Sequence, residues 1–210
     1  MARIRSCIAI GASILIACAC TRPSARGLDS SVSLDAAADS TWYVPPGGCA
    51  GNAAIRLPAD SLRISSGWSD TTRDRNAQDA ALARVVPGGW GGEWLENGGL
   101  VIALVDTSRR VEAVRALYAR GYRVDGDLMR ARAQPVSWDL AQLDDWFNVI
   151  IPRAFERRVT TNADIDRMHN RISLGARDST QKRPLTALLA SLNVPCHLVS
   201  IGPGMVARSR

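Results

Sequence analysis

Three side chains close together in this sequence could form a hydrolytic site. Asp166, His169 and Ser173 are the residue types of a nucleophilic triad, in which a carboxylate orients an imidazole and the imidazole takes a serine proton. All three fall in one expected hairpin, where neighbours rarely reach that geometry. No Gly-x-Ser-x-Gly turn accompanies them. We therefore expect them to be turn residues without a catalytic role.

Two pairs of carboxylates could support acid–base hydrolysis of a glycoside. Asp144 and Asp145 are adjacent on an expected helix and therefore point to different sides. Asp164 and Asp166 share one face of an expected strand, an arrangement that also suits a solvated turn. The second pair is the basis of an alternative hypothesis, a cell-envelope hydrolase in which Asp164 and Asp166 would be the first residues to replace.

The histidines and glycines do not predict a cofactor or a metal site. His169 and His197 are the two histidines, and neither belongs to a His-x-x-Glu-His motif or to paired Cys-x-x-Cys clusters. The glycines between residues 88 and 92 precede a strand, so they lack the amide cluster of a phosphate site at a helix start. We predict no metal, no cofactor and no catalytic residue.

The N-terminus predicts export. Arg3 and Arg5 precede an uncharged, mostly apolar stretch, residues 7–17, that is shorter than the roughly 20 residues of a membrane span. Its end, Leu15-Ile16-Ala17-Cys18, resembles the lipobox of bacterial lipoproteins. The resemblance implies a diacylglyceryl group on Cys18, cleavage before it, and acylation of the new amine with a chain such as palmitate.

Two questions about the export signal and the destination of the protein stay open. The signal could be an ordinary secretory one, cut near Ala17 or Ala19, with Cys18 incidental. For a lipoprotein, Ala19 stands where an aspartate for inner-membrane retention could stand, so family analogy favours the outer membrane. We expect an exported protein, anchored to a membrane by its N-terminal lipid on the periplasmic face of the outer membrane or at the cell surface.

The composition predicts a folded body behind a tether. Of the 210 residues, 46% are apolar, which favours a packed core over disorder. The expected organisation is a signal peptide (1–17), a flexible tether (18–41) and two α/β units (42–136 and 137–210). Without Arg3 and Arg5 the net charge falls from +6 to +4. That charge lies on mixed-sign helix faces, so no nucleic acid is expected as a partner.

The body contains an internal repeat at an offset of 72 residues. Residues 100–108 and 172–180 each predict a strand that runs into an aspartate–hydroxyl pair and then a helix. Asp106 and Asp178 are predicted to cap those helices. A hairpin precedes each copy, with a turn at Asn97-Gly98 in the first. A strand follows each helix, at residues 128–136 and 196–201. The first helix is predicted to carry an apolar face made of Val111, Val114, Leu117 and Tyr118. We predict an α+β fold of two similar strand-hairpin-strand-helix-strand units, with helices on one face of small, mostly antiparallel sheets.

Further elements complete the body. A helix is predicted near residues 74–86, and another, ended or kinked by Pro152, carries an apolar stripe that forms the seam between units. The stripe comprises Trp138, Leu140, Leu143, Trp146, Phe147, Ile150 and Ile151.

The sequence allows two interpretations of one cysteine pair and two of one tryptophan pair. Cys49 and Cys196 could form a disulfide in an oxidising compartment, or stay two buried free thiols. Six of the eleven aromatic residues are tryptophan. Trp90 and Trp94 could fill the core or could line a contact surface for a protein or glycan partner.

Part of the body resembles the prodomains of alpha-lytic and streptogrisin-type bacterial proteases. The motifs that carry the resemblance are residues 88–94 with 99–106, and residues 136–143 with 164–166 and 170–172, and it covers roughly residues 88–201, most of the body. Prodomains of that family assist the folding of the attached enzyme and then inhibit it. Here the chain ends at Arg210 without a protease, so the resemblance implies a separate inhibitor or folding helper of an exported protease. The expected function is a lipid-anchored binding module without catalytic activity.

Overall fold

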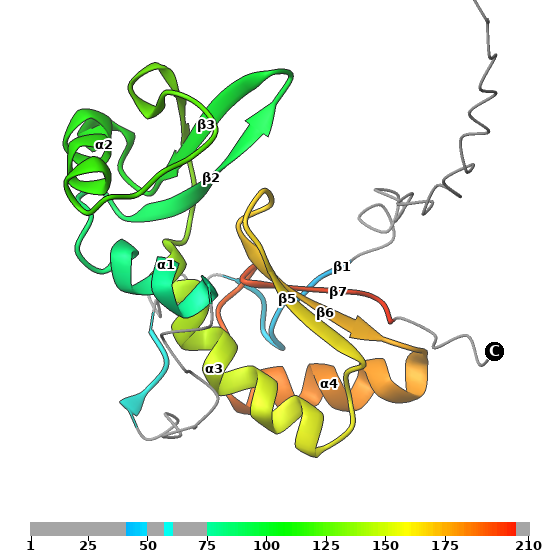
Figure 1. Cartoon of the computed structure of the whole chain (residues 1–210). Coiled ribbons are helices and arrows are strands. Elements are labelled where there is room, and N and C mark those ends of the chain that lie inside the picture. The colour runs from blue at the N-terminus through cyan, green and yellow to red at the C-terminus, as the bar shows by residue number, and fades with distance from the viewer. Residues whose placement is uncertain (1–40, 50–56, 61–74, 205–210) are drawn as a thin grey trace, which may run out of the picture. The chain divides into compact units, whose positions relative to one another are not determined.

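Two sheets built from repeated units organise this protein, which is α+β as predicted (Figure 1). The computed structural model describes residues 41–49, 57–60 and 75–204, all of them within one compact unit. The predictions on the signal peptide, on Cys18 and on the tether up to residue 40 lie outside the described residues, as does Trp68.

The first sheet is built from residues 90–135. Strands β2 (Trp90–Glu96) and β3 (Gly99–Leu104) form an antiparallel hairpin, and β4 (Arg132–Pro135) pairs with β3 in parallel. The chain between β3 and β4 forms the 3-10 turns η3 (Thr107–Arg109) and η4 (Leu128–Arg130) and the helix α2 (Arg110–Ala119). The hairpin turns at Asn97-Gly98, where both residues have positive φ, as predicted.

The second sheet repeats this plan. Strands β5 (Asn162–Asp166) and β6 (Arg171–Ala176) form a hairpin, helix α4 (Ser179–Ser191) follows, and β7 (Val199–Pro203) returns parallel to β6. Strand β1 (Thr41–Trp42) extends the sheet, whose order is β1-β7-β6-β5. The predicted repeat is confirmed, because β3 and β6 begin 72 residues apart and stand at the same place in each unit.

Both predicted aspartate caps are confirmed. Asp106 accepts a hydrogen bond from the Ser108 amide at 3.0 Å, and Asp178 accepts one from the Thr180 amide at 2.9 Å. Together with these amides, the Ser108 and Thr180 hydroxyls hold the pKa of both carboxyls below the usual value. Asp106 caps η3, one turn ahead of α2, whereas Asp178 caps α4 directly.

Helix α3 (Leu140–Glu156) lies at the seam between the units, as predicted. It contacts β2 of the first sheet, β5 and β6 of the second, and the helix α1 (Arg75–Ala83). Its predicted stripe is buried except for Phe147, which is half-buried. The prediction that Pro152 ends the helix is wrong, since the helix continues to Glu156. The proline removes a single hydrogen bond, and the buried Ala154 stabilises the last turn.

Three local predictions are also corrected. Residues 128–130 form η4 rather than the start of a strand, because Asp127 caps them by accepting from the Met129 amide. The last strand begins at Val199, since His197 before it adopts a left-handed backbone with φ of 61°. Val111 is exposed, and Ala113 takes its place on the buried face of α2.

Candidate functional site

Side chains from all four strands of the second sheet form a polar face, on the side away from the buried Ile172 and Leu174. Asp164 pairs with Ser173, Ser173 with Ser200, and Ser200 with Trp42, and paired residues project to the same side of a sheet. Asp166 and Arg171 form the next pair along the hairpin. These six residues, called the polar face below, include the acids and the serine considered from the sequence.

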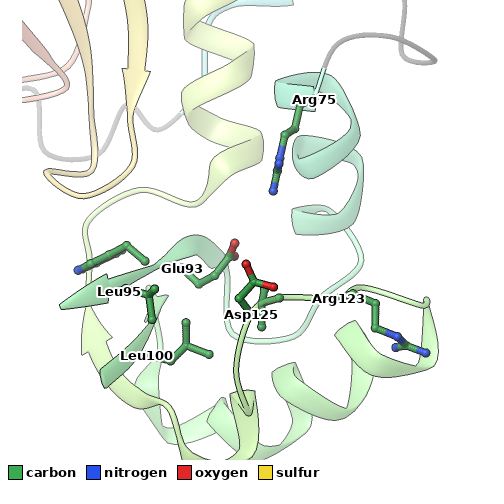
Figure 2. Close-up of a pocket in the computed structure, with 8 residues that line it drawn as sticks. Arg75, Glu93, Leu95, Leu100, Arg123 and Asp125 are labelled. Atoms are coloured by element: carbon green, nitrogen blue, oxygen red, sulfur yellow. The ribbon is translucent and has the colours of Figure 1, made fainter. Parts of the chain in front are cut away.

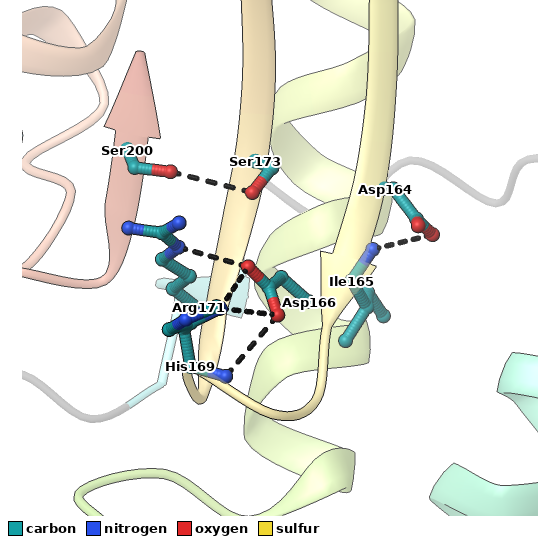
Figure 3. A network of polar contacts seen from close by, with 7 residues as sticks. All are labelled: Asp164, Ile165, Asp166, His169, Arg171, Ser173 and Ser200. Atoms are coloured by element: carbon teal, nitrogen blue, oxygen red, sulfur yellow. Dashed lines mark hydrogen bonds and ion pairs between the residues drawn. The ribbon is translucent and has the colours of Figure 1, made fainter. Parts of the chain in front are cut away.

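The triad considered from the sequence is not assembled (Figure 3). His169 Nδ1 lies 2.8 Å from an Asp166 oxygen, and Arg171 Nε donates to the same carboxylate at 3.1 Å. Ser173 Oγ lies 3.3 Å from Ser200 Oγ, and among the described residues no hydrogen bond joins it to His169. The Asp166 carboxylate therefore holds its own hairpin together and activates no serine.

The four carboxylates of the two candidate pairs each have partners of their own. Asp164 accepts a hydrogen bond from the Ile165 amide at 2.8 Å, while Asp166 binds His169 and Arg171. On α3, Asp145 pairs with Arg84 at 2.9 Å, and the buried Asp144 accepts from Asn148. Asp166 and Asp145 are thus in ion pairs, whereas Asp164 and Asp144 accept hydrogen bonds from neighbouring groups.

The edge of the polar face carries an aromatic and sulfur cluster. The Arg171 guanidinium lies over the Trp42 ring, 5.1 Å from its centroid, and the Trp42 ring lies 5.7 Å from the His197 ring. His197 Nε2 is 3.8 Å from Cys49 Sγ. The structure joins Cys49 and Cys196 in a disulfide with Cα atoms 5.5 Å apart, a spacing within the usual range for such bridges.

Trp90 and Trp94 do not share a surface. Trp90 pairs with Leu104 and Trp94 with Val101, which project to opposite sides of β3. A bulge between Trp90 and Gly92 shifts the alternation by one residue, and Gly92 takes the φ of 111° that this requires. Trp90 is 0% exposed, so the expectation that it contacts a partner is wrong. Trp94 is half-buried.

The bulge also turns Glu93 to the same side as Trp90, beside an open pocket (Figure 2). The pocket has a volume of about 410 Å³ and is lined by Arg75, Glu93, Trp94, Leu95, Leu100, Arg123, Val124 and Asp125. Glu93 Oε1 accepts from the Tyr122 hydroxyl at 2.8 Å. Glu93 Oε2 is buried and has no hydrogen-bond partner among the described residues.

Charged side chains of α1 and of the β5–β6 turn lie around Glu93. Arg167, in the β5–β6 turn, pairs with the buried Asp79 of α1 at 2.7 Å and donates to Asn76 at 3.0 Å. Arg75 lies 3.7 Å from Asp79. Burial raises the pKa of Glu93, against the opposing effects of Tyr122 and Arg167. Burial and the Glu93 charge raise the pKa of Tyr122 as well.

Replacing Glu93 with glutamine is expected to change how stability depends on pH. Because the pKa of Glu93 is raised above its ordinary value of 4.5, the folded protein holds this proton more tightly than the unfolded chain does. Its contribution is fully present below the unfolded pKa and is lost as the pH rises through the folded pKa. Urea unfolding between about pH 4 and pH 8 should show the wild type losing stability relative to Glu93→Gln. A difference that is constant with pH would contradict this assignment.

Sequence reasoning missed Glu93, and the reason is geometric. Regular alternation of side chains along β2 would place Glu93 on the other side of the sheet from Trp90, where it would face solvent. The available signal was the Gly91-Gly92 pair before an acid in an otherwise apolar strand, since paired glycines in a strand are typical of a bulge.

No protein-family model matches this chain, and no curated protein gives a sequence match to it. Within the described residues, none of the helices combines the length and the apolar character needed to cross a membrane. The function is therefore inferred from the side chains and their surroundings.

Proposed function

We propose that this chain is a non-catalytic binding module that binds a protein partner at the Glu93 pocket. Lipid on Cys18 would anchor it at the periplasmic face of the outer membrane or at the cell surface. The supporting observation is the Glu93 carboxyl group. One oxygen is satisfied by Tyr122, and the other is buried without a partner among the described residues. An acceptor left unpaired in this way is costly, and a donor from a partner would remove that cost.

The lining of the pocket specifies the partner's chemistry. Leu95 and Leu100 provide an apolar floor, while Glu93 and Asp125 supply carboxylates. Figure 2 shows both carboxyl groups directed into the space below Arg75. A lysine or arginine side chain suits these features, because its methylene stem packs on leucine and its cationic head donates to carboxylates. We infer a partner that presents a basic side chain.

The polar face supports binding over catalysis. Its serine hydroxyls bond each other, and the Asp166 carboxylate is occupied by His169 and Arg171. A nucleophile must instead lie within reach of a base that can accept its proton. The prodomain resemblance suggests a specific variant of the proposal, in which the partner is an exported chymotrypsin-like protease that the module inhibits or helps to fold.

The pocket is tested by measuring binding with Glu93→Gln. The amide keeps an oxygen for Tyr122 but places a donor where the partner needs an acceptor. An affinity loss of about 5-fold to 100-fold is expected, as for one unpaired buried group. Glu96→Gln is the matched control, since Glu96 lies exposed on the same strand and pairs with Arg132.

The immobilised protein is used to capture partners from solubilised cell envelope. Binding to the exported proteases of its own cell, and any slowing of their activity, is measured separately. Capture of a protein by the wild type and by Glu96→Gln, but not by Glu93→Gln, would support the proposal. If no chymotrypsin-like protease is bound or slowed, the inhibitor variant is rejected. If Glu93→Gln captures the same partner with the same affinity, the pocket is not the binding site.

The membrane anchor is tested by labelling growing cells with radioactive palmitate. The wild type and Cys20→Ser should incorporate the label and fractionate with membranes, because two or three acyl chains hold a protein stably. Cys18→Ser should do neither. Label on Cys18→Ser, or an unlabelled wild type, would reject the lipid.

One observation favours a second candidate function, a cell-envelope hydrolase. Glu93 and the exposed Asp125 line one pocket, and burial raises the pKa of Glu93, as it does for the general acid of a hydrolase that uses two carboxyl groups. This pair replaces Asp164 and Asp166. Turnover of cell-wall oligosaccharides or peptides that is lost in both Glu93→Gln and Asp125→Asn would support it. No turnover across such a panel would reject it.

A further inference from the structure

We propose that Cys49, Cys196 and His197 form a redox-gated site for zinc(II), closed by the disulfide and opened by a dithiol reductant. The three donor atoms lie within 4.8 Å of one another. Two thiolates and an imidazole are ligands that zinc prefers. This inference is independent of the Glu93 pocket.

The distance from imidazole to sulfur already suits a metal ion. His197 Nε2 lies 3.8 Å from Cys49 Sγ. In a tetrahedral zinc site, bonds of about 2.3 Å to sulfur and about 2.0 Å to nitrogen place the two donors about 3.5 Å apart. When the disulfide is cut, rotation about the Cα–Cβ bonds separates the two sulfurs to the roughly 3.8 Å of the same geometry.

Backbone hydrogen bonds hold the three ligands together without the disulfide. The Tyr43 amide donates to Val199 at 2.8 Å, and the His197 amide donates back to Tyr43 at 3.2 Å. Tyr43 itself is 2% exposed and belongs to the core. The turn that leads to Cys49 is closed by a bond from Gly48 to Pro45 at 3.0 Å. Both segments therefore stay beside each other after reduction.

The site is accessible to a dithiol reductant and to a metal ion. His197 is exposed, and both cysteines are partly exposed. A thiolate of the reductant attacks one sulfur of the disulfide, and its second thiol displaces the protein sulfur from the mixed disulfide. Two electrons and two protons pass to the protein, and the reductant becomes a cyclic disulfide. Zinc(II) then replaces the two thiol protons, which are released.

The three protein ligands leave a fourth position to water or to a group from a partner. The site also borders the polar face, since the His197 ring lies 5.7 Å from that of Trp42, which covers Arg171. The sequence predicted no metal because it has no His-x-x-Glu-His motif and no paired Cys-x-x-Cys clusters, and Cys49 and Cys196 are 147 residues apart. Only the pairing of β1 with β7 brings them to one place.

The test is cobalt(II) and zinc(II) titration of the full chain carrying Cys7→Ser, Cys18→Ser and Cys20→Ser, which leaves only Cys49 and Cys196, either oxidised or reduced with a phosphine. The oxidised protein should bind no metal. The reduced protein should bind one cobalt(II) with sulfur-to-cobalt absorption, and zinc(II) should displace the cobalt and protect both thiols from alkylation. His197→Gln should weaken binding at least about 10-fold, whereas His169→Gln should not change it.

Each contrary result overturns the proposal. Binding by the oxidised protein, or binding without sulfur-to-cobalt absorption, would place the metal elsewhere. Equal affinity in His197→Gln would remove the imidazole from the site. A reduced protein that binds no metal, or whose circular dichroism shows loss of the native fold, would show that the backbone does not hold the ligands in place.

Discussion

Trp90→Ala is expected to lower the free energy of unfolding by about 3–5 kcal/mol, the usual cost of removing a large buried aromatic side chain. Trp90 is among the largest fully buried side chains of the protein. Its ring meets the Tyr122 ring edge-on, with centroids 5.0 Å apart and planes at 78°. The alanine variant leaves a cavity beneath β2 and removes the ring that positions the Tyr122 hydroxyl for Glu93. Urea unfolding followed by circular dichroism measures the loss.

Trp90→Phe is the matched control. The indole Nε1 of Trp90 has no hydrogen-bond partner among the described residues, so phenylalanine removes no hydrogen bond. It keeps a ring against Tyr122, and the expected cost is less than half that of alanine. A loss below about 1 kcal/mol for Trp90→Ala would mean that the first sheet does not pack around this ring.

Asn170→Ala is expected to cost about 3–5 kcal/mol, because one buried side chain makes three hydrogen bonds to another part of the chain. Its oxygen accepts from the amides of Ser137 and Trp138 at 3.1 and 2.9 Å, and its nitrogen donates to the Trp138 carbonyl at 2.7 Å. These bonds tie the β5–β6 turn to the residues just before α3. The backbone of Asn170 is also left-handed, with φ of 52°, which alanine adopts at a further cost of about 1 kcal/mol.

Two further substitutions separate these effects. Asn170→Gly relieves the backbone strain but keeps the loss of hydrogen bonds, so it should be about 1 kcal/mol more stable than Asn170→Ala. Asn170→Asp keeps the acceptor, loses the donor and buries a charge, so the variant should become less stable as the pH rises through the pKa of the new carboxyl. An alanine variant as stable as the wild type would show that the turn and α3 are held together by other contacts.

The repeated units could be predicted because their signals are local. A turn at Asn97-Gly98, the caps at Asp106 and Asp178, and apolar faces at helical spacing depend on residues a few positions apart. The same order of strand, aspartate cap and helix signals recurs in the second unit at an offset of 72 residues. The structure confirms the order of elements in both copies and the buried stripe of α3.

The positions of the chemical groups could not be predicted so well. A single bulge at Gly91-Gly92 reverses which side of β2 each later residue faces, and this separates Trp94 from the buried Trp90 and turns Glu93 toward a pocket. The pair of Asp79 with Arg167 spans two elements that no sequence pattern connects. Hairpin propensity likewise does not reveal that Asn170 binds the backbone before α3.

By itself, the sequence determined the α+β class, the duplicated order of elements, the helix caps and most of the apolar faces, because local backbone preference and periodic burial decide these features. Tertiary structure alone decided that Glu93 keeps one oxygen without a partner in the part of the chain that the structure describes, that Ser173 bonds Ser200 rather than His169, and that Cys49 and Cys196 meet beside His197. Such features depend on distances between residues far apart in the chain, and those distances exist only once the strands have paired and the helices have packed.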